Sequence, residues 1–118
     1  MIYAASGHRA SSLGTDYPPK QLKLVEFAQI TLRKFQPTRV LTGMALGWDQ
    51  AIARAAIREG VPFDAYVPYE GQERFWHSTD RAAYRDLLGA ASRVEVIDPD
   101  KELHFREALM RRNEVMAR

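Results

Sequence analysis

Hydrophobic and polar residues follow two alternating periods along this chain. Short runs of β-branched and apolar residues predict four strands, at residues 2–6, 38–42, 63–67 and 94–97. Between these runs, apolar residues recur every three or four positions, which predicts helices. The first helix is expected at residues 20–35, and the second at residues 50–59 with Gly60 as its stop. The third is expected to begin at a Ser78 or Thr79 cap and to carry Ala91 on its inner face, and the last to begin at an Asp100 cap.

This alternation of strands and helices predicts the fold class. We expect an α/β, Rossmann-like three-layer fold, with a mostly parallel sheet of about four to five strands and helices on both faces. The 118 residues fit a single domain, 1–118. Ligands of such sheets bind beyond the carboxyl ends of the strands, where the strand order reverses. Polar residues that follow the first three strands are therefore expected to meet at one edge.

The residue types present exclude several classes of chemistry. The sequence has no Cys, which excludes disulfides, a thiolate metal site and a cysteine nucleophile. His8, His77 and His104 lie on different predicted elements without metal-ligand spacing, so no metal site is expected. The sequence has neither a Walker lysine motif nor a Gly-x-Ser-x-Gly elbow. P-loop nucleotide hydrolases and serine hydrolases therefore find no support.

Charge and hydropathy bear on the partners. Residues 1–59 hold eight basic and four acidic side chains, a mild positive bias that favours a small anionic ligand over duplex nucleic acid. No apolar run approaches the ~20 residues of a membrane span. No basic region precedes the first strand, as it would in a signal peptide. A cytoplasmic protein without a membrane partner is expected.

The most informative segment joins the second strand to the second helix: Thr42-Gly43-Met44-Ala45-Leu46-Gly47-Trp48-Asp49. Such a turn aims backbone N–H groups and the positive end of the helix dipole at one point, which suits a phosphate. Glycine is expected there because it adopts positive φ and has no Cβ to block a ligand. The alternative is that Gly43 and Gly47 only allow the helix and the strand to pack closely.

Charged side chains near this turn extend the candidate site. Ser6-Gly7-His8-Arg9 follows the first strand, where the Arg9 guanidinium could hold a phosphate through paired hydrogen bonds. Asp49 could accept a hydrogen bond from a ribose hydroxyl. The structural alternatives are a solvated loop arginine at Arg9 and, at Asp49, a carboxylate that only stabilises the helix dipole.

The loop after the third strand brings aromatic and polar side chains to the same edge. Tyr69 and Trp76 offer flat faces on which a base could stack, although loop aromatics often pack into the core instead. Glu70 and Gln72 offer polar groups to a base or a ribose. This loop is therefore expected to hold the part of the ligand away from the phosphate.

Together these segments resemble the SLOG superfamily, most closely its YpsA-like, Rossmann-type branch. The resemblance rests on four blocks in the family's order: Gly7-His8-Arg9, Thr42 to Asp49, Pro68-Tyr69-Glu70-Gly71-Gln72 with Trp76, and Arg112-Asn113 with Met116. The blocks are more distantly similar to those of DNA-processing protein A. The resemblance implies a site for a nucleotide or a nucleotide-derived signal such as ADP-ribose or an NAD-like molecule. A related branch, the lysine-decarboxylase-like phosphoribohydrolases, cleaves the bond between ribose and base.

One departure from the family makes binding a stronger expectation than catalysis. Family members continue into a further strand and a Gly-Gly-Thr turn, whereas this sequence stops at Arg118, and the phosphoribohydrolase signature Pro-Gly-Gly-x-Gly-Thr-x-x-Glu is missing. Half of a two-sided phosphate site is then expected to be absent. An unpaired strand edge predicts a homo-oligomer, in which the final helix would contribute apolar area from Leu109, Met110, Val115 and Met116.

The sequence therefore predicts a domain that binds a nucleotide-type small molecule, a role that suits a sensor, with no certain cofactor. The expected ligand-binding residues are Ser6, Gly7, His8, Arg9, Thr42, Gly43, Met44, Ala45, Gly47, Asp49, Glu70, Gln72, Trp76, Arg112 and Asn113. One alternative is a nucleotide N-glycosidase or phosphoribohydrolase with Asp49 or Glu70 as the acid. The other is weak binding of single-stranded DNA by the basic N-terminal half and exposed aromatics.

Overall fold

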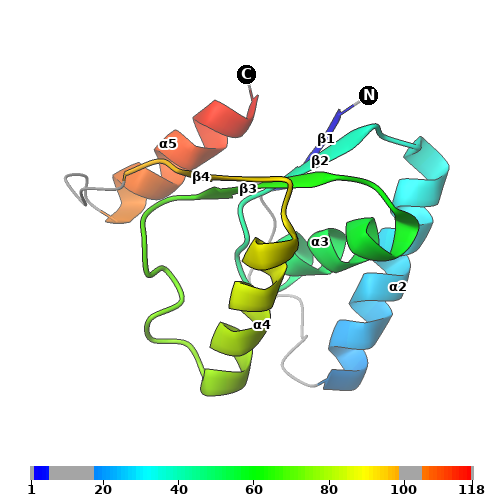
Figure 1. Ribbon diagram of the computed structural model, residues 1–118, viewed down its shortest axis with the longest axis horizontal. Helices are drawn as coiled ribbons and strands as arrows, with labels where there is room; N and C mark the ends of the chain where they lie inside the picture. The colour runs from blue at the N-terminus through cyan, green and yellow to red at the C-terminus, as the bar shows by residue number, and fades with distance from the viewer. Residues whose placement is uncertain (1, 6–17, 99–104, 118) are drawn as a thin grey trace.

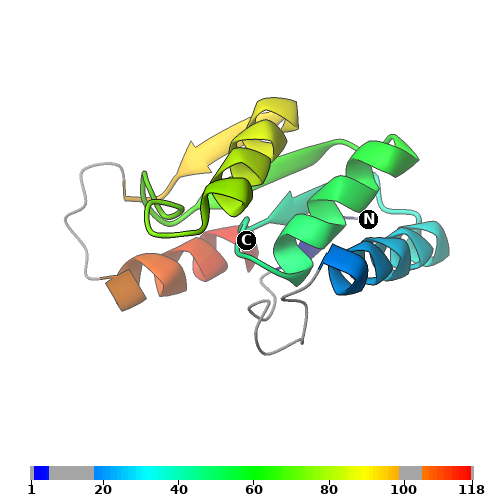
Figure 2. The ribbon, with the colours of Figure 1, turned by 90° about the horizontal axis from the view of Figure 1, so that it is seen from below.

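Four parallel strands form one sheet whose two faces are covered by helices (Figure 1). The computed structural model describes residues 2–5, 18–98 and 105–117. The strands are β1 (Ile2–Ala5), β2 (Arg39–Thr42), β3 (Phe63–Val67) and β4 (Arg93–Val96), and the helices are α2 (Pro18–Phe35), α3 (Trp48–Glu59), α4 (Ser78–Ala90) and α5 (Phe105–Ala117). Figures 1 and 2 show α2, α3 and α4 on one face and α5 on the other. The expected α/β, three-layer fold is confirmed.

The strand order in space is the same as the order in the sequence, β1-β2-β3-β4. Each strand pairs in parallel with the next, in a register that aligns Ala5 with Thr42, Thr42 with Ala65, and Ala65 with Val94. Every crossover steps in one direction, so right-handed connections place α2, α3 and α4 on the same face. The expected reversal of strand order is therefore wrong for the described strands. Among the described helices, α5 alone lies on the other face.

The hydrophobic core lies between the sheet and the helices α2, α3 and α4. Val40 and Phe63 are almost completely buried on the sheet, and Leu32 of α2 belongs to the same core cluster. α3 presents small side chains to this layer, which lets the helix approach both the sheet and α2 closely. The buried alanines of α3 are Ala51, Ala53, Ala55 and Ala56. This packing fixes the amino end of α3 over the carboxyl edge of the sheet.

Three helix starts differ from the expected ones. α3 begins at Trp48 rather than at residue 50. α2 begins at Pro18 rather than Lys20, because proline is well suited to a first helical turn, where its missing N–H has no intrahelical partner. α4 is capped by His77 rather than by Ser78 or Thr79. The Nδ1 atom of His77 accepts a 3.4 Å hydrogen bond from the Thr79 backbone N–H. Ser78 and Thr79 therefore lie inside the first turn of α4.

The helix ends show one confirmed prediction and one error. α3 ends at Gly60, which adopts a left-handed conformation at φ 71° and donates its N–H back to the helix, as expected. Ala91 was expected on the inner face of α4, but it caps that helix in an extended conformation. The predicted Asp100 cap of the final helix lies outside the described residues.

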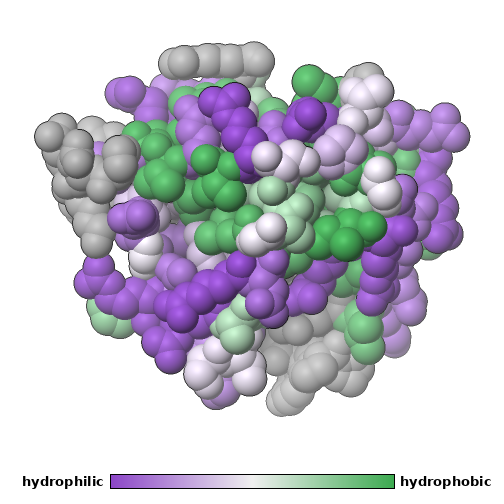
Figure 3. Space-filling view, viewed as in Figure 1, coloured by the Kyte–Doolittle hydropathy of each residue, from purple (hydrophilic) through white to green (hydrophobic). Residues whose placement is uncertain are grey.

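Apolar side chains remain exposed at the sheet edges and on α5. Figure 3 shows them along the level of the sheet, and among them Ile2 and Val94 lie on the outer strands β1 and β4. On α5, Met110 is exposed, whereas Met116 is buried against its own chain. Met116 therefore cannot supply the exposed area that the sequence attributed to it. None of the described helices combines the length and apolarity that a membrane span requires.

A polar clamp joins the carboxyl end of α3 to α2. Arg33 donates two hydrogen bonds to the Glu59 carboxylate, at 2.8 and 3.0 Å, and Gln29 donates a third at 2.9 Å. The hydrogen bonds from Arg33, followed by the one from Gln29, lower the pKa of the Glu59 carboxyl. The ionised carboxylate is therefore favoured in the folded state.

We predict that Glu59→Gln flattens the dependence of stability on acidic pH. A lowered folded-state pKa stabilises the protein above the unfolded pKa of about 4.3, and this contribution disappears as the pH falls through the folded-state value. The parent should therefore lose more melting temperature than the variant between neutral pH and strongly acidic pH. Glu26→Gln, at an exposed carboxylate of α2, is the control and should behave like the parent. Parallel curves for Glu59→Gln and the parent would contradict the clamp.

Candidate functional site

The turn between β2 and α3 is built from its own hydrogen bonds. The Gly43 N–H donates to the Ala5 carbonyl at 3.2 Å, which extends the β1–β2 ladder by one step. The Met44 N–H donates to the Thr42 Oγ1 at 3.2 Å, and the Ala45 N–H donates to the Asp49 Oδ2 at 3.3 Å. The expectation that the turn leaves its amides free is therefore wrong for Gly43, Met44 and Ala45. The backbone N–H groups of the first turn of α3 are therefore the candidate donors to a ligand in this segment.

Buried side chains hold this turn against the start of α3. The Thr42 hydroxyl donates a 2.8 Å hydrogen bond to the Asp49 carbonyl, and the Gln50 side chain donates to the Met44 carbonyl at 3.2 Å. Thr42, Met44 and Asp49 are completely buried. The side chains of Thr42, Asp49 and Gln50 therefore organise the turn, and any contact between this segment and a ligand would come from its backbone.

Two residues of the turn have positive φ. Met44 has φ 61°, which is uncommon for a residue with a side chain, and Gly47 has φ 97° with ψ −127°, a combination that suits glycine. Gly47 occupies the cap position of α3 and provides no side-chain hydrogen bond to the helix. The amino end of α3 therefore keeps the partial positive charge of its first-turn N–H groups.

Arg112 of α5 reaches this turn from the other face of the sheet. Its NH1 atom donates a 3.3 Å hydrogen bond to the Gly43 carbonyl, and its Nε and NH2 atoms donate to the Asn113 Oδ1 at 3.2 and 3.0 Å. A Cβ atom on Gly43 would lie 2.7 to 2.9 Å from three atoms of the guanidinium. A side chain at position 43 would therefore force the guanidinium of a residue 69 positions later in the sequence to shift.

The charge of Arg112 is only partly compensated. The residue is 6% exposed, and burial lowers the pKa of its guanidinium, while the nearby Asp49 carboxylate opposes that shift. In the part of the chain that the structure describes, no carboxylate lies at ion-pairing distance from Arg112. Among the described residues, the bonds to Gly43 and Asn113 use one N–H of NH1 and one of NH2, and the second N–H of each has no hydrogen-bond partner there. This buried cation can therefore accept a further anionic partner.

Gln72 connects the turn to the loop after β3. Its Nε2 donates to the Gly43 carbonyl at 3.4 Å and to the Tyr84 hydroxyl at 3.1 Å. The Trp76 ring packs edge-on against Tyr84, with ring centroids 5.2 Å apart at an interplanar angle of 86°. Trp76 is half-buried and lies against the core, so it buttresses Tyr84.

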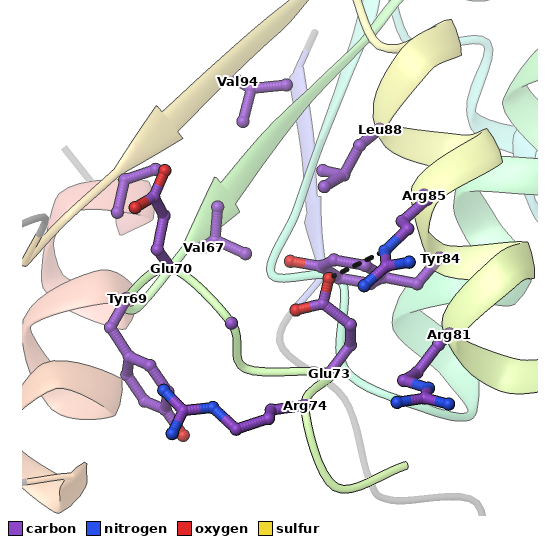
Figure 4. A pocket seen from close by; sticks show the side chains of 12 residues that line it. Val67, Tyr69, Glu70, Glu73, Arg74, Arg81, Tyr84, Arg85, Leu88 and Val94 are labelled. Carbon is purple, nitrogen blue, oxygen red and sulfur yellow. Dashed lines mark ion pairs between the residues drawn. The ribbon is translucent and has the colours of Figure 1, made fainter. Parts of the chain in front are cut away.

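A pocket opens beside Tyr84, between the β3–α4 loop and α4 (Figure 4). Tyr69 and Glu70, which the sequence selected, line it. Residues that sequence reasoning did not select also line it, namely Glu73, Arg74, Arg81 and Arg85. The spacing of Arg81 and Arg85, one helical turn apart on the predicted helix, was the available signal, but such pairs usually lie on solvated faces.

The structure brings together most of the predicted site. The carboxyl edge of the sheet carries Gly43, the start of α3, Gln72 and Arg112, while Asn113 is exposed and orients the Arg112 guanidinium. Glu70 lies on the neighbouring pocket. Ser6, Gly7, His8 and Arg9 lie outside the described residues.

No protein-family model matches the chain, and no curated protein matches it. The resemblance to the SLOG superfamily therefore stays a prediction.

We predict that Gly43→Ala displaces the Arg112 guanidinium and lowers the free energy of unfolding by about 1.5–3 kcal/mol, the range for a lost hydrogen bond to a charged group. Arg112→Ala should remove most of this cost, so the double variant should show strong non-additivity. Gly89→Ala, with open space around the new methyl group, should be neutral or stabilise by about 0.5–1 kcal/mol. Chemical denaturation measures all four. Strict additivity of Gly43→Ala and Arg112→Ala would contradict the contact.

Proposed function

We propose that this protein binds a nucleotide-type ligand, such as ADP-ribose or an NAD-like molecule, with a phosphate held between the amino end of α3 and Arg112. The observation that carries the proposal is the buried Arg112 guanidinium, which donates a hydrogen bond to the Gly43 carbonyl. Among the described residues, no carboxylate lies at ion-pairing distance from it. A phosphate oxygen there would accept charge-assisted hydrogen bonds. It would also lie in the field of the α3 amino end.

The remainder of the ligand would extend toward the β3–α4 loop. Gln72 already reaches the Gly43 carbonyl, so the loop begins next to the phosphate position. The exposed Glu70 offers a carboxylate that can accept hydrogen bonds from ribose hydroxyls or a base amine. This direction fits a ligand longer than inorganic phosphate.

Binding is a better fit than hydrolysis. Asp49 is completely buried, and its carboxylate is held by the Ala45 N–H, so it is not available to protonate a leaving base. Glu70 is the remaining carboxylate that the sequence proposed as an acid. The single-stranded DNA alternative is distinguished by its salt dependence, because a protein that contacts many phosphates loses affinity steeply as salt rises.

The test compares two arginines of α5 by calorimetric titration with ADP-ribose. Arg112→Lys keeps the charge but removes the planar fork, so the affinity should fall by about tenfold or more. Arg111→Lys, at the neighbouring exposed residue that faces Glu114 at 3.9 Å, should bind like the parent. ADP-ribose should also raise the parent's melting temperature by mass action.

Equal affinities of the parent and a folded Arg112→Lys variant would overturn the proposed site. The absence of binding by the parent at millimolar ADP-ribose and NAD would overturn the proposed ligand class. Tight binding of a single-stranded oligonucleotide that persists at high salt would favour the nucleic-acid alternative instead.

We also propose that the chain associates with itself. The outer strands β1 and β4 carry the exposed apolar residues Ile2 and Val94, and α5 carries the exposed Met110. Exposed strand edges with apolar side chains are commonly buried by association. Sedimentation equilibrium at micromolar concentration should therefore give a mass above 13.5 kDa. A single species at that mass would contradict self-association.

A further inference from the structure

The open pocket beside Tyr84 has the volume of a small-molecule site. Its volume is about 550 Å³, within the usual range for ligand pockets. The β3–α4 loop forms one wall, α4 forms the other, and β3 and β4 form the floor (Figure 4). It lies on the α4 face of the sheet, and neither Arg112 nor the Gly43 turn lines it.

One side of this pocket is apolar. Val67 and Val94 project from β3 and β4, and Leu88 faces them from α4 (Figure 4). Val94 is 43% exposed, so this surface is not covered by the described part of the chain. Water against such a surface is unfavourable, and a flat apolar group that replaced it would gain free energy.

The other side carries more positive charge than its own carboxylates neutralise. Arg81 and Arg85 lie one turn apart on α4, an arrangement of like charges that weakens a helix. The Arg85 Nε lies 3.7 Å from the Glu73 carboxylate. Neither Arg81 nor Arg74 has an ion-pairing partner in the described residues. An anion in the pocket would stabilise this cluster.

Tyr84 adds a hydrogen-bond donor at the centre of the pocket. Its side chain is buried, and its hydroxyl oxygen accepts the hydrogen bond from Gln72. Burial raises the pKa of the Tyr84 hydroxyl, so the group stays protonated. The hydroxyl is fixed in place and can donate to a ligand.

We propose that this pocket is a second ligand site, which binds a small organic anion: a phosphate or a carboxylate attached to an apolar ring. Arg81 and Arg85 hold the anionic group, and the ring lies against Val67, Val94 and Leu88. The Tyr84 hydroxyl donates to the ligand from the α4 wall. The site goes beyond the proposed nucleotide function, because it uses neither the α3 amino end nor Arg112, although Glu70 borders both sites.

The test uses phenyl phosphate and benzoate as probes on the full chain, measured by calorimetric titration. At least one of them should bind at submillimolar to millimolar concentration. The difference between their affinities shows whether the site prefers a phosphate or a carboxylate. Inorganic phosphate lacks the ring, and benzyl alcohol lacks the charge. Each of these should bind at least about tenfold more weakly than the better probe, because each loses one of the two contact types.

Two substitutions in the pocket test whether the probe binds there. Arg81→Gln should weaken binding of the better probe by about tenfold or more. Val94→Glu should do the same by introducing a like charge on the apolar side. Arg93→Gln, which removes an exposed charge outside the pocket, is the matched control and should leave the affinity unchanged. Circular dichroism checks that each variant is folded. If Arg81→Gln does not fold, Val94→Glu provides the test of the pocket.

Three results would overturn the second site. The first is the absence of binding of both probes at millimolar concentration. The second is equal affinity of the parent and both folded pocket variants. The third is loss of probe binding in Arg112→Lys but not in Arg81→Gln, which would place the probe at the α3 end and leave the nucleotide proposal standing. Conversely, loss of ADP-ribose binding alone would leave the second site intact.

Discussion

The buried guanidinium of Arg112 is the contact on which the arrangement of the candidate site depends. It brings α5, the one described helix on its face of the sheet, into hydrogen-bonding distance of the Gly43 carbonyl. It fits the glycine at position 43, because a Cβ there would overlap the guanidinium and force it to shift. Asn113 orients it through two hydrogen bonds. A cation buried to this degree is costly, and an anion that reached it would return part of that cost as binding free energy.

The same carbonyl links this cation to the pocket on the opposite face. Gln72 donates both to the Gly43 carbonyl and to the Tyr84 hydroxyl. One amide group therefore connects the turn before α3 to a side chain that lines the pocket. Ligands at the two places would act on neighbouring ends of one hydrogen-bonded chain. If either ligand moved Gln72, the hydrogen bonds at the other site would change as well. Such a shared contact is the physical condition for coupling between the affinities of the two sites.

The sequence predicted the elements well because their apolar periods are strong, and it predicted the edge of the sheet where polar residues gather. The His77 cap was missed because serine and threonine are the usual caps and both followed it. The strand order was missed because periodicity carries no information on which strands become neighbours. The contact between Gly43 and Arg112 spans 69 positions, and only the resemblance to a family connected the two residues before the structure did.

Amide-resolved NMR during an ADP-ribose titration tests the central claim most directly, since a chain of 13.5 kDa gives well-resolved spectra. We expect the largest shifts at the backbone N–H groups of Gly47, Trp48 and Asp49 and at the Arg112 side-chain Nε–H, because a phosphate at the α3 amino end would contact these donors. Unchanged signals from these groups, with shifts confined to other parts of the chain, would contradict a phosphate site at Arg112.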